Sequence, residues 1–90
     1  MSTSPSSSVQ EARKAVAKRL RDLREDAGLT AVALASEAGW ERTKVSKIEH
    51  AARAPSVADI RTWCRVCNAE DQAEDLLAAL RAVAGMYVEW

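Results

Sequence analysis

The sequence has few of the residues that mark β-sheets, disulfide frameworks or metal centres. Its 90 residues include three glycines, two prolines, two cysteines, one histidine and no phenylalanine. Few turn residues, and no alternating run of β-branched residues, argue against a β fold. No apolar run approaches transmembrane length, and the Ser-rich N-terminus lacks the apolar core of a signal peptide. We therefore expect an all-α, cytoplasmic protein with reduced thiols.

The same absences argue against an enzyme or a metal centre. No Ser/His/Asp grouping, Gly-rich phosphate loop or paired set of acids is evident. Cys64 and Cys67 form a C-x-x-C string, but a redox pair needs its first cysteine at a helix N-terminus, and zinc needs two further ligands. The apolar stripe of their helix already requires both, so we interpret them as core residues. We expect no cofactor.

The charged residues are unevenly distributed along the chain, although the net charge is zero. Residues 11–53 hold ten Lys or Arg against seven Asp or Glu, whereas residues 54–90 hold three against six. A DNA-binding domain needs only a basic face, because salt screens charges beyond about 10 Å at 0.1 M. A low total charge implies weak non-specific binding and favours a dimer.

Helical periodicity and end signals divide the chain into three parts. We expect a disordered polar tail, a helix-turn-helix domain and a C-terminal helix, at residues 1–8, 9–69 and 70–90. Ser8 with Glu11, and Ser56 with Asp59, have the spacing of capping boxes and predict the starts of the first and fourth helices. The overall prediction is a five-helix, all-α domain.

The most informative segment is residues 31–50, which predicts two short helices joined at Gly39. Thr30 can cap the first of them, and Gly39 can end it in a left-handed conformation. At about 100° per residue, Val45 and Ile48 fall on one side of the second helix and must face inward. The opposite side and its flanks carry hydrogen-bond donors and no acid: Arg42, Thr43, Lys44, Ser46, Lys47 and His50. Such a face suits base edges and phosphates, although a solvated surface is the simpler alternative for any single helix.

A set of motifs with specific spacing extends this pattern over about residues 12 to 68. They are Leu20-Arg21-Asp22-Leu23-Arg24-Glu25-Asp26-Ala27-Gly28-Leu29-Thr30, Leu34-Ala35, Gly39-Trp40, Lys44-Val45-Ser46-Lys47-Ile48-Glu49 and Pro55-Ser56. Together they resemble the phage-repressor (Cro/C1, XRE) helix-turn-helix family, and most closely its actinobacterial branch. The resemblance implies a five-helix, lambda-repressor-like DNA-binding domain whose third helix enters the major groove.

The resemblance also implies roles for individual residues in the second short helix. Arg42, Thr43 and Lys47 would contact bases, with Ser46 and His50 nearby. The position of His50 fits two roles equally well, either ending the helix or contacting a phosphate or base edge.

Phosphate contacts are expected around this helix. Lys44 and Arg53 would bind phosphates, although a solvated Arg53 is nearly as plausible. Thr30 and the amides of the helix after it are further contacts. The basic residues of the first helix are mostly a solubilising face, from which Lys18 or Arg21 could approach the DNA backbone.

In that family an arginine late in the first helix pairs with the glutamate that ends the third. Here these residues are Arg24 and Glu49, and the helical periodicity of both segments supports a partly buried pair that fixes the recognition helix.

The sequence departs from the family pattern at four positions. Ala31 and Ala33 replace a phosphate-contacting Gln and a capping Glu. Glu41 replaces the usual cap of the recognition helix, and Ala51 replaces a glycine. These departures weaken the expected hold on the DNA backbone but do not affect the expected fold.

The sequence thus predicts a sequence-specific, double-stranded DNA-binding transcriptional regulator, either a stand-alone reader or the N-terminal part of a longer protein. The alternative is a protein-interaction module, antitoxin-like or partner-binding, that keeps the helix-turn-helix fold. Tyr87 and Trp90 have little of so small a domain to bury them. We expect the helix of residues 70–90 to pack on the domain and to serve as a dimer, partner or connector helix; a missing C-terminal domain would equally explain the two aromatic residues.

Overall fold

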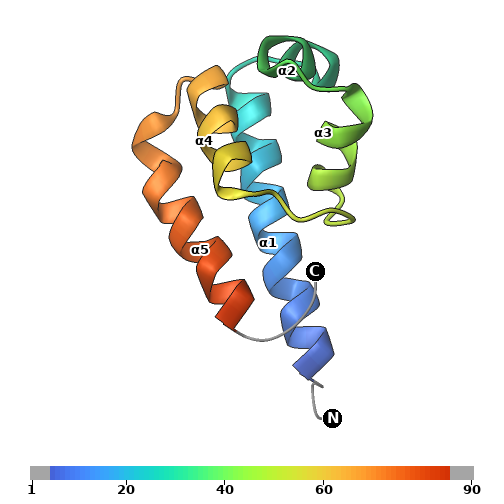
Figure 1. The fold of residues 1–90 in the computed structure, drawn as a ribbon, viewed down its shortest axis with the longest axis vertical. Coiled ribbons are helices and arrows are strands. Elements are labelled where there is room, and N and C mark those ends of the chain that lie inside the picture. Colours follow the sequence, from blue (N-terminus) through green and yellow to red (C-terminus); the bar gives the residue numbers. More distant parts are fainter. Residues whose placement is uncertain (1–4, 86–90) are drawn as a thin grey trace.

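The computed structural model describes the backbone of residues 5–85 and the side chains of residues 8–85. This part of the chain forms five α-helices and one 3-10 turn and contains no strand (Figure 1), so the all-α, five-helix prediction is confirmed. The elements are α1 (Pro5–Asp26), α2 (Ala31–Ala38), α3 (Arg42–Glu49), α4 (Val57–Val66), η1 (Glu70–Gln72) and α5 (Ala73–Gly85). Tyr87 and Trp90, the predicted interface residues, lie outside the described residues.

The first helix begins earlier than the sequence predicted. α1 starts at Pro5, so the second half of the segment expected to be a disordered tail is helical, and the predicted capping box of Ser8 with Glu11 lies inside the helix. Proline suits a first helical position because its missing N–H would have no partner there. Residues 1–4 lie outside the described part of the chain.

The helices enclose one apolar core around Trp63 of α4. In Figure 1, α1 runs through the middle of the molecule, with α4 and α5 on one side of it and α3 on the other. Trp63 is fully buried, and its indole N–H donates a hydrogen bond to the Leu20 carbonyl at 2.8 Å. Other fully buried side chains come from all five helices: Leu20, Leu34, Val45, Ile48, Ile60, Cys64, Leu76 and Leu77. The inner side of α3 therefore packs on a core that the whole domain builds.

The turn between α2 and α3 has the predicted chemistry. The Thr30 hydroxyl accepts a hydrogen bond from the Ala33 amide at 3.0 Å and caps α2. Gly39 ends the helix with φ +75°, a left-handed conformation that glycine adopts without strain. The Trp40 amide then donates to the Ala35 carbonyl at 2.8 Å, which closes the turn and directs the chain into α3.

Candidate nucleic-acid interface

The structure divides α3 into the inner and outer sides that the sequence predicted. Val45 and Ile48 are fully buried. Thr43, Ser46 and Lys47 on the opposite side are exposed. Arg42 at the start of the helix is exposed as well. α3 therefore exposes hydrogen-bond donors on the side opposite to its fully buried apolar residues.

His50 ends α3 and keeps one ring nitrogen available. Its Nδ1 lies 2.7 Å from the Ser46 carbonyl oxygen. A carbonyl can only accept, so Nδ1 carries the hydrogen in this bond, and Nε2 is the atom left for another partner. His50 therefore caps the end of α3, and its exposed Nε2 remains available for a phosphate or base edge.

The ion pair expected between Arg24 and Glu49 is present and nearly buried. Arg24 Nε and Nη2 lie 2.6 and 3.0 Å from the two Glu49 carboxylate oxygens, and Nη1 donates to the Leu29 carbonyl at 2.8 Å. The side chains are 13% and 6% exposed, respectively. The hydrogen bond with Glu49 raises the pKa of Arg24 further above its ordinary value. One guanidinium therefore joins the end of α3 to α1 and to the segment that leads into α2.

Lys44 forms a second ion pair, on the other flank of α3. Its Nζ lies 2.9 Å from Asp59 Oδ1 on α4 and 4.3 Å from the centre of the Trp40 ring. Only 20% of the Lys44 side chain is exposed. Lys44 falls on the flank next to the buried side, where its charge meets an acid within the protein. The predicted phosphate contact of Lys44 stays a prediction, and the ion pair with Asp59 gives Lys44 a role within the domain.

Asp59 serves two partners at once. One carboxylate oxygen binds Lys44, and the other accepts a hydrogen bond from the Ser56 amide at 3.0 Å. The Asp59 amide in turn donates to the Ser56 hydroxyl, so the predicted capping box of α4 is confirmed. Burial would raise the pKa of Asp59, but the hydrogen bonds from Lys44 and Ser56 and the charge of Lys44 outweigh it and hold the pKa below its ordinary value of 3.8.

The lowered pKa of Asp59 predicts a defined loss of stability in acid. Because the carboxylate is stabilised in the folded state, its contribution is fully present above the unfolded pKa and is lost as pH falls through the folded pKa. We expect the free energy of unfolding to be higher for the parent than for Asp59→Asn. The difference should be constant near neutral pH and should become smaller below about pH 4. Urea unfolding at a series of pH values measures this difference. A gap that stays constant down to pH 2 would contradict the assignment.

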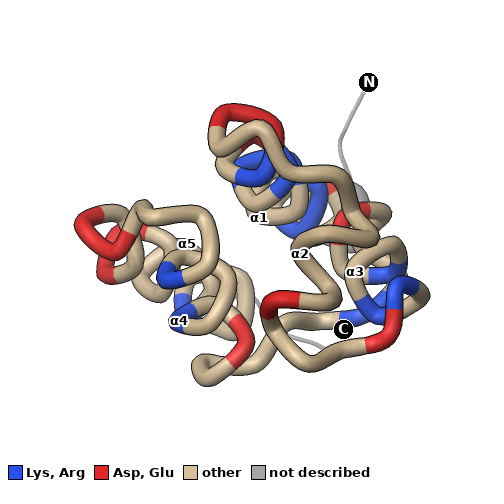
Figure 2. The backbone as a smooth tube through the Cα atoms, turned by 90° about the horizontal axis from the view of Figure 1, so that it is seen from above, with Lys and Arg blue, Asp and Glu red and all other residues tan. Residues whose placement is uncertain are grey.

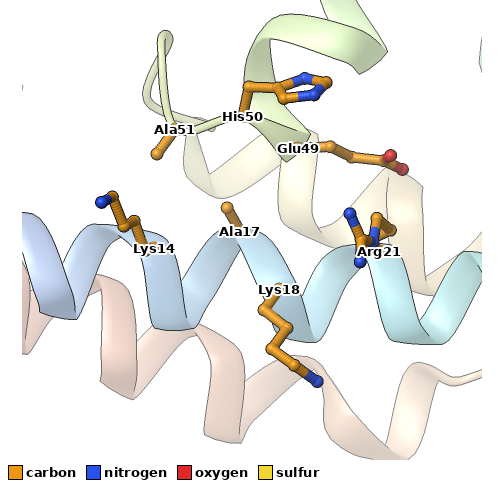
Figure 3. A pocket seen from close by; sticks show the side chains of 7 residues that line it. All are labelled: Lys14, Ala17, Lys18, Arg21, Glu49, His50 and Ala51. Atoms are coloured by element: carbon orange, nitrogen blue, oxygen red, sulfur yellow. The ribbon is translucent and has the colours of Figure 1, made fainter.

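A pocket of ≈ 330 Å³ lies between α1 and the end of α3 (Figure 3). Its lining residues are Lys14, Ala17, Lys18, Arg21, Glu49, His50 and Ala51. The figure shows Lys14 and Arg21 on either side of the small Ala17, with His50 across from them. Lys18 pairs with Asp22 at 2.8 Å on the exposed surface, and Arg21 lies 3.8 Å from Glu25. Exposed pairs of this kind contribute little, so these cations can reorient towards an anion.

The remaining candidate contacts lie outside α3. Thr30 is exposed at the start of α2, and Arg53 is exposed in the loop after α3. Figure 2 shows Lys and Arg segments on α1 and α3 and fewer on α4 and α5, with Asp and Glu segments at the end of α1, beside α2 and α3, and near α5. Most of the Lys and Arg residues in the described part of the chain therefore belong to α1 and α3.

The structure supports a core role for the two cysteines. Cys64 and Cys67 are free and buried. Burial raises the pKa of both thiols, that of Cys67 to about 11, which leaves them protonated and unreactive at neutral pH. No group of three potential metal ligands is found among the described residues.

Residues 15–80 match a protein family described as a helix-turn-helix domain. The chain belongs to this helix-turn-helix family. No curated protein and no solved structure matches the chain. Membership indicates a DNA-binding domain of a typically non-enzymatic kind, and none of the described helices is long and apolar enough to span a membrane.

Sequence reasoning missed one part of this helix-turn-helix site, the contact of Lys44 with Asp59 and Trp40. The spacing between Lys44 and Asp59 crosses a loop, so no helical periodicity links them. The sequence signal that could have indicated this contact was the position of Lys44 around the helix axis. At about 100° per residue, Lys44 and Glu49 lie at similar angles on either side of the buried pair, so both belong to the flanks rather than to the outer side.

Proposed function

We propose that the protein is a sequence-specific, double-stranded DNA-binding transcriptional regulator that reads the major groove with α3. The exposed donors of α3, fixed over a fully buried inner side, support this proposal most strongly. Arg42 and Lys47 are long enough to reach base edges, with Thr43 and Ser46 as shorter contacts. Arginine pairs best with guanine, which presents two acceptors in the major groove.

Phosphate contacts would hold α3 in register. Thr30 precedes α2, His50 and Arg53 follow α3, and Arg21 and His50 line the same pocket. Because the total charge of the chain is zero, one copy has a limited electrostatic hold on DNA. We therefore propose that two copies bind half-sites about 34 Å apart, one helical turn of DNA.

A selection of bound duplexes from a random pool tests the proposed function directly. The parent should enrich one sequence, and Arg42→Ala should lose about 10- to 100-fold in preference for one base pair of it. Arg53→Ala should instead weaken binding to all sequences alike and lower the salt slope by about one. Arg61→Ala is a matched control, because Arg61 is exposed on α4 and pairs with Glu74. If the parent enriches no sequence, the proposal fails and a protein-interaction role is favoured.

A further inference from the structure

We propose that Asp59 is a positioning residue for DNA recognition, which fixes the rotation of α3 about its own axis by holding Lys44. This inference rests on the proposed function, because it concerns how accurately the outer side of α3 is presented to DNA. Asp59 lies on α4 and is 9% exposed, so it acts on DNA through Lys44 rather than by touching it.

The apolar contacts of α3 do not set its rotation by themselves. α3 has eight residues, and only Val45 and Ile48 are buried. These two residues lie about 60° apart around the helix axis. Their burial shows which side of α3 faces the core, but it does not fix the exact rotation of α3 about its axis. Apolar burial is also non-directional, so a small turn of the helix about this side changes little. Such a turn would still move the ends of long side chains on the outer side.

Ion pairs on the two flanks of α3 are directional, and they can therefore fix the rotation that the apolar contacts leave free. Glu49 is held by Arg24 from α1, and Lys44 is held by Asp59 from α4. The two pairs have opposite polarity across α3, since the helix contributes the acid on one flank and the base on the other. Charged hydrogen bonds are short and geometrically specific. Rotation in either direction therefore stretches one of the two pairs.

Asp59 is itself fixed, which a positioning residue must be. Its second oxygen binds the Ser56 amide at 3.0 Å in the capping box of α4. Lys44 Nζ also lies over the ring of Trp40, 4.3 Å from its centre, and that ring lies 6.1 Å from the ring of the buried Trp63. The Lys44 ammonium therefore contacts both an anchored carboxylate and an aromatic ring that packs on the core, and a rotation of α3 would stretch its bond to Asp59.

Asp59→Asn separates positioning from simple electrostatics by the direction of its effect. Asparagine keeps an acceptor for the Ser56 amide but loses the charge that holds Lys44. On charge alone, removing an acid from a DNA-binding domain tightens binding to every duplex. If Asp59 positions α3, preference for the selected sequence falls even though binding to random duplex is unchanged or tighter.

The test measures Kd for the selected duplex and for a random duplex with the parent, Asp59→Asn, Lys44→Met and the double variant. We expect each single variant to lose about tenfold in the ratio of the two constants, and the double variant to lose no more than either, because contacting residues act as one unit. Lys44→Met leaves the capping box intact, and circular dichroism checks that each variant is folded. Arg61→Met is the matched control, since it breaks the exposed pair of Arg61 with Glu74 and Arg61 is not among the candidate DNA contacts.

Three outcomes would overturn the inference. One is an Asp59→Asn protein that keeps its sequence preference. Another is additive losses in the double variant. The third is a Lys44→Met protein that binds all duplexes more weakly with a flatter salt slope, which would make Lys44 a phosphate contact. A parent that prefers no duplex at all instead refutes the proposed function, whatever the variants do.

Discussion

Glu49→Ala is expected to lower the free energy of unfolding by about 3 kcal/mol, because it leaves the Arg24 guanidinium without its carboxylate in a nearly buried site. The change removes two charged hydrogen bonds, at 2.6 and 3.0 Å. Arg24 still bonds the Leu29 carbonyl, so the stranded cation cannot easily turn out into water. Urea unfolding followed by circular dichroism measures the loss.

The double variant Arg24→Met/Glu49→Leu distinguishes a stranded charge from the net contribution of the pair. Replacing a buried pair by apolar side chains of similar size is often neutral or stabilising, so we expect the double variant to be more stable than Glu49→Ala. Arg61→Ala, which breaks an exposed pair with Glu74, should change stability by less than about 1 kcal/mol. If Glu49→Ala also loses less than about 1 kcal/mol, the Arg24–Glu49 pair is effectively solvated.

Trp63→Ala is expected to cost about 3–5 kcal/mol, the other large effect in this domain. Trp63 is the largest of the fully buried side chains, and helices around it cannot close the space that an alanine leaves. A domain of this size has a stability of only about 5–10 kcal/mol, so the variant should be partly unfolded at 37 °C. Thermal unfolding followed by far-ultraviolet circular dichroism measures the effect.

Trp63→Phe divides the effect of Trp63 into two parts. Phenylalanine restores much of the apolar volume but cannot donate to the Leu20 carbonyl, which Trp63 reaches at 2.8 Å. We expect an intermediate loss, larger than about 1 kcal/mol. Val57→Ala is a control, because Val57 is 50% exposed and should have little effect. Equal stability of Trp63→Ala and the parent would contradict the packing described for the core.

The local features of α3 could be predicted from the sequence because they depend on helix geometry alone. A repeat of about 100° per residue places Val45 and Ile48 together, and Gly39 marks the turn before them. The pairing of Arg24 with Glu49 came from the resemblance, with periodicity in support. These features need no knowledge of how distant helices cross.

Other features depend on tertiary placement or on weak local preferences, and here the sequence was insufficient. The contact of Lys44 with Asp59 requires the crossing of α3 and α4, and Asp59 by itself signals only a helix cap. The start of α1 at Pro5 depends on a run of serines, whose helix propensity decides little.

The anchoring of α3 limits how the domain can be re-engineered. Both of its ionic attachments reach outside the short helix pair, one to α1 and the other to α4. A peptide of residues 30–50, or a graft of that segment onto a foreign scaffold, would carry every side chain proposed to read bases and neither attachment point. The smallest transferable unit for the proposed DNA recognition is therefore the whole domain from α1 through α5, because Leu76 and Leu77 of α5 complete the core on which α3 packs.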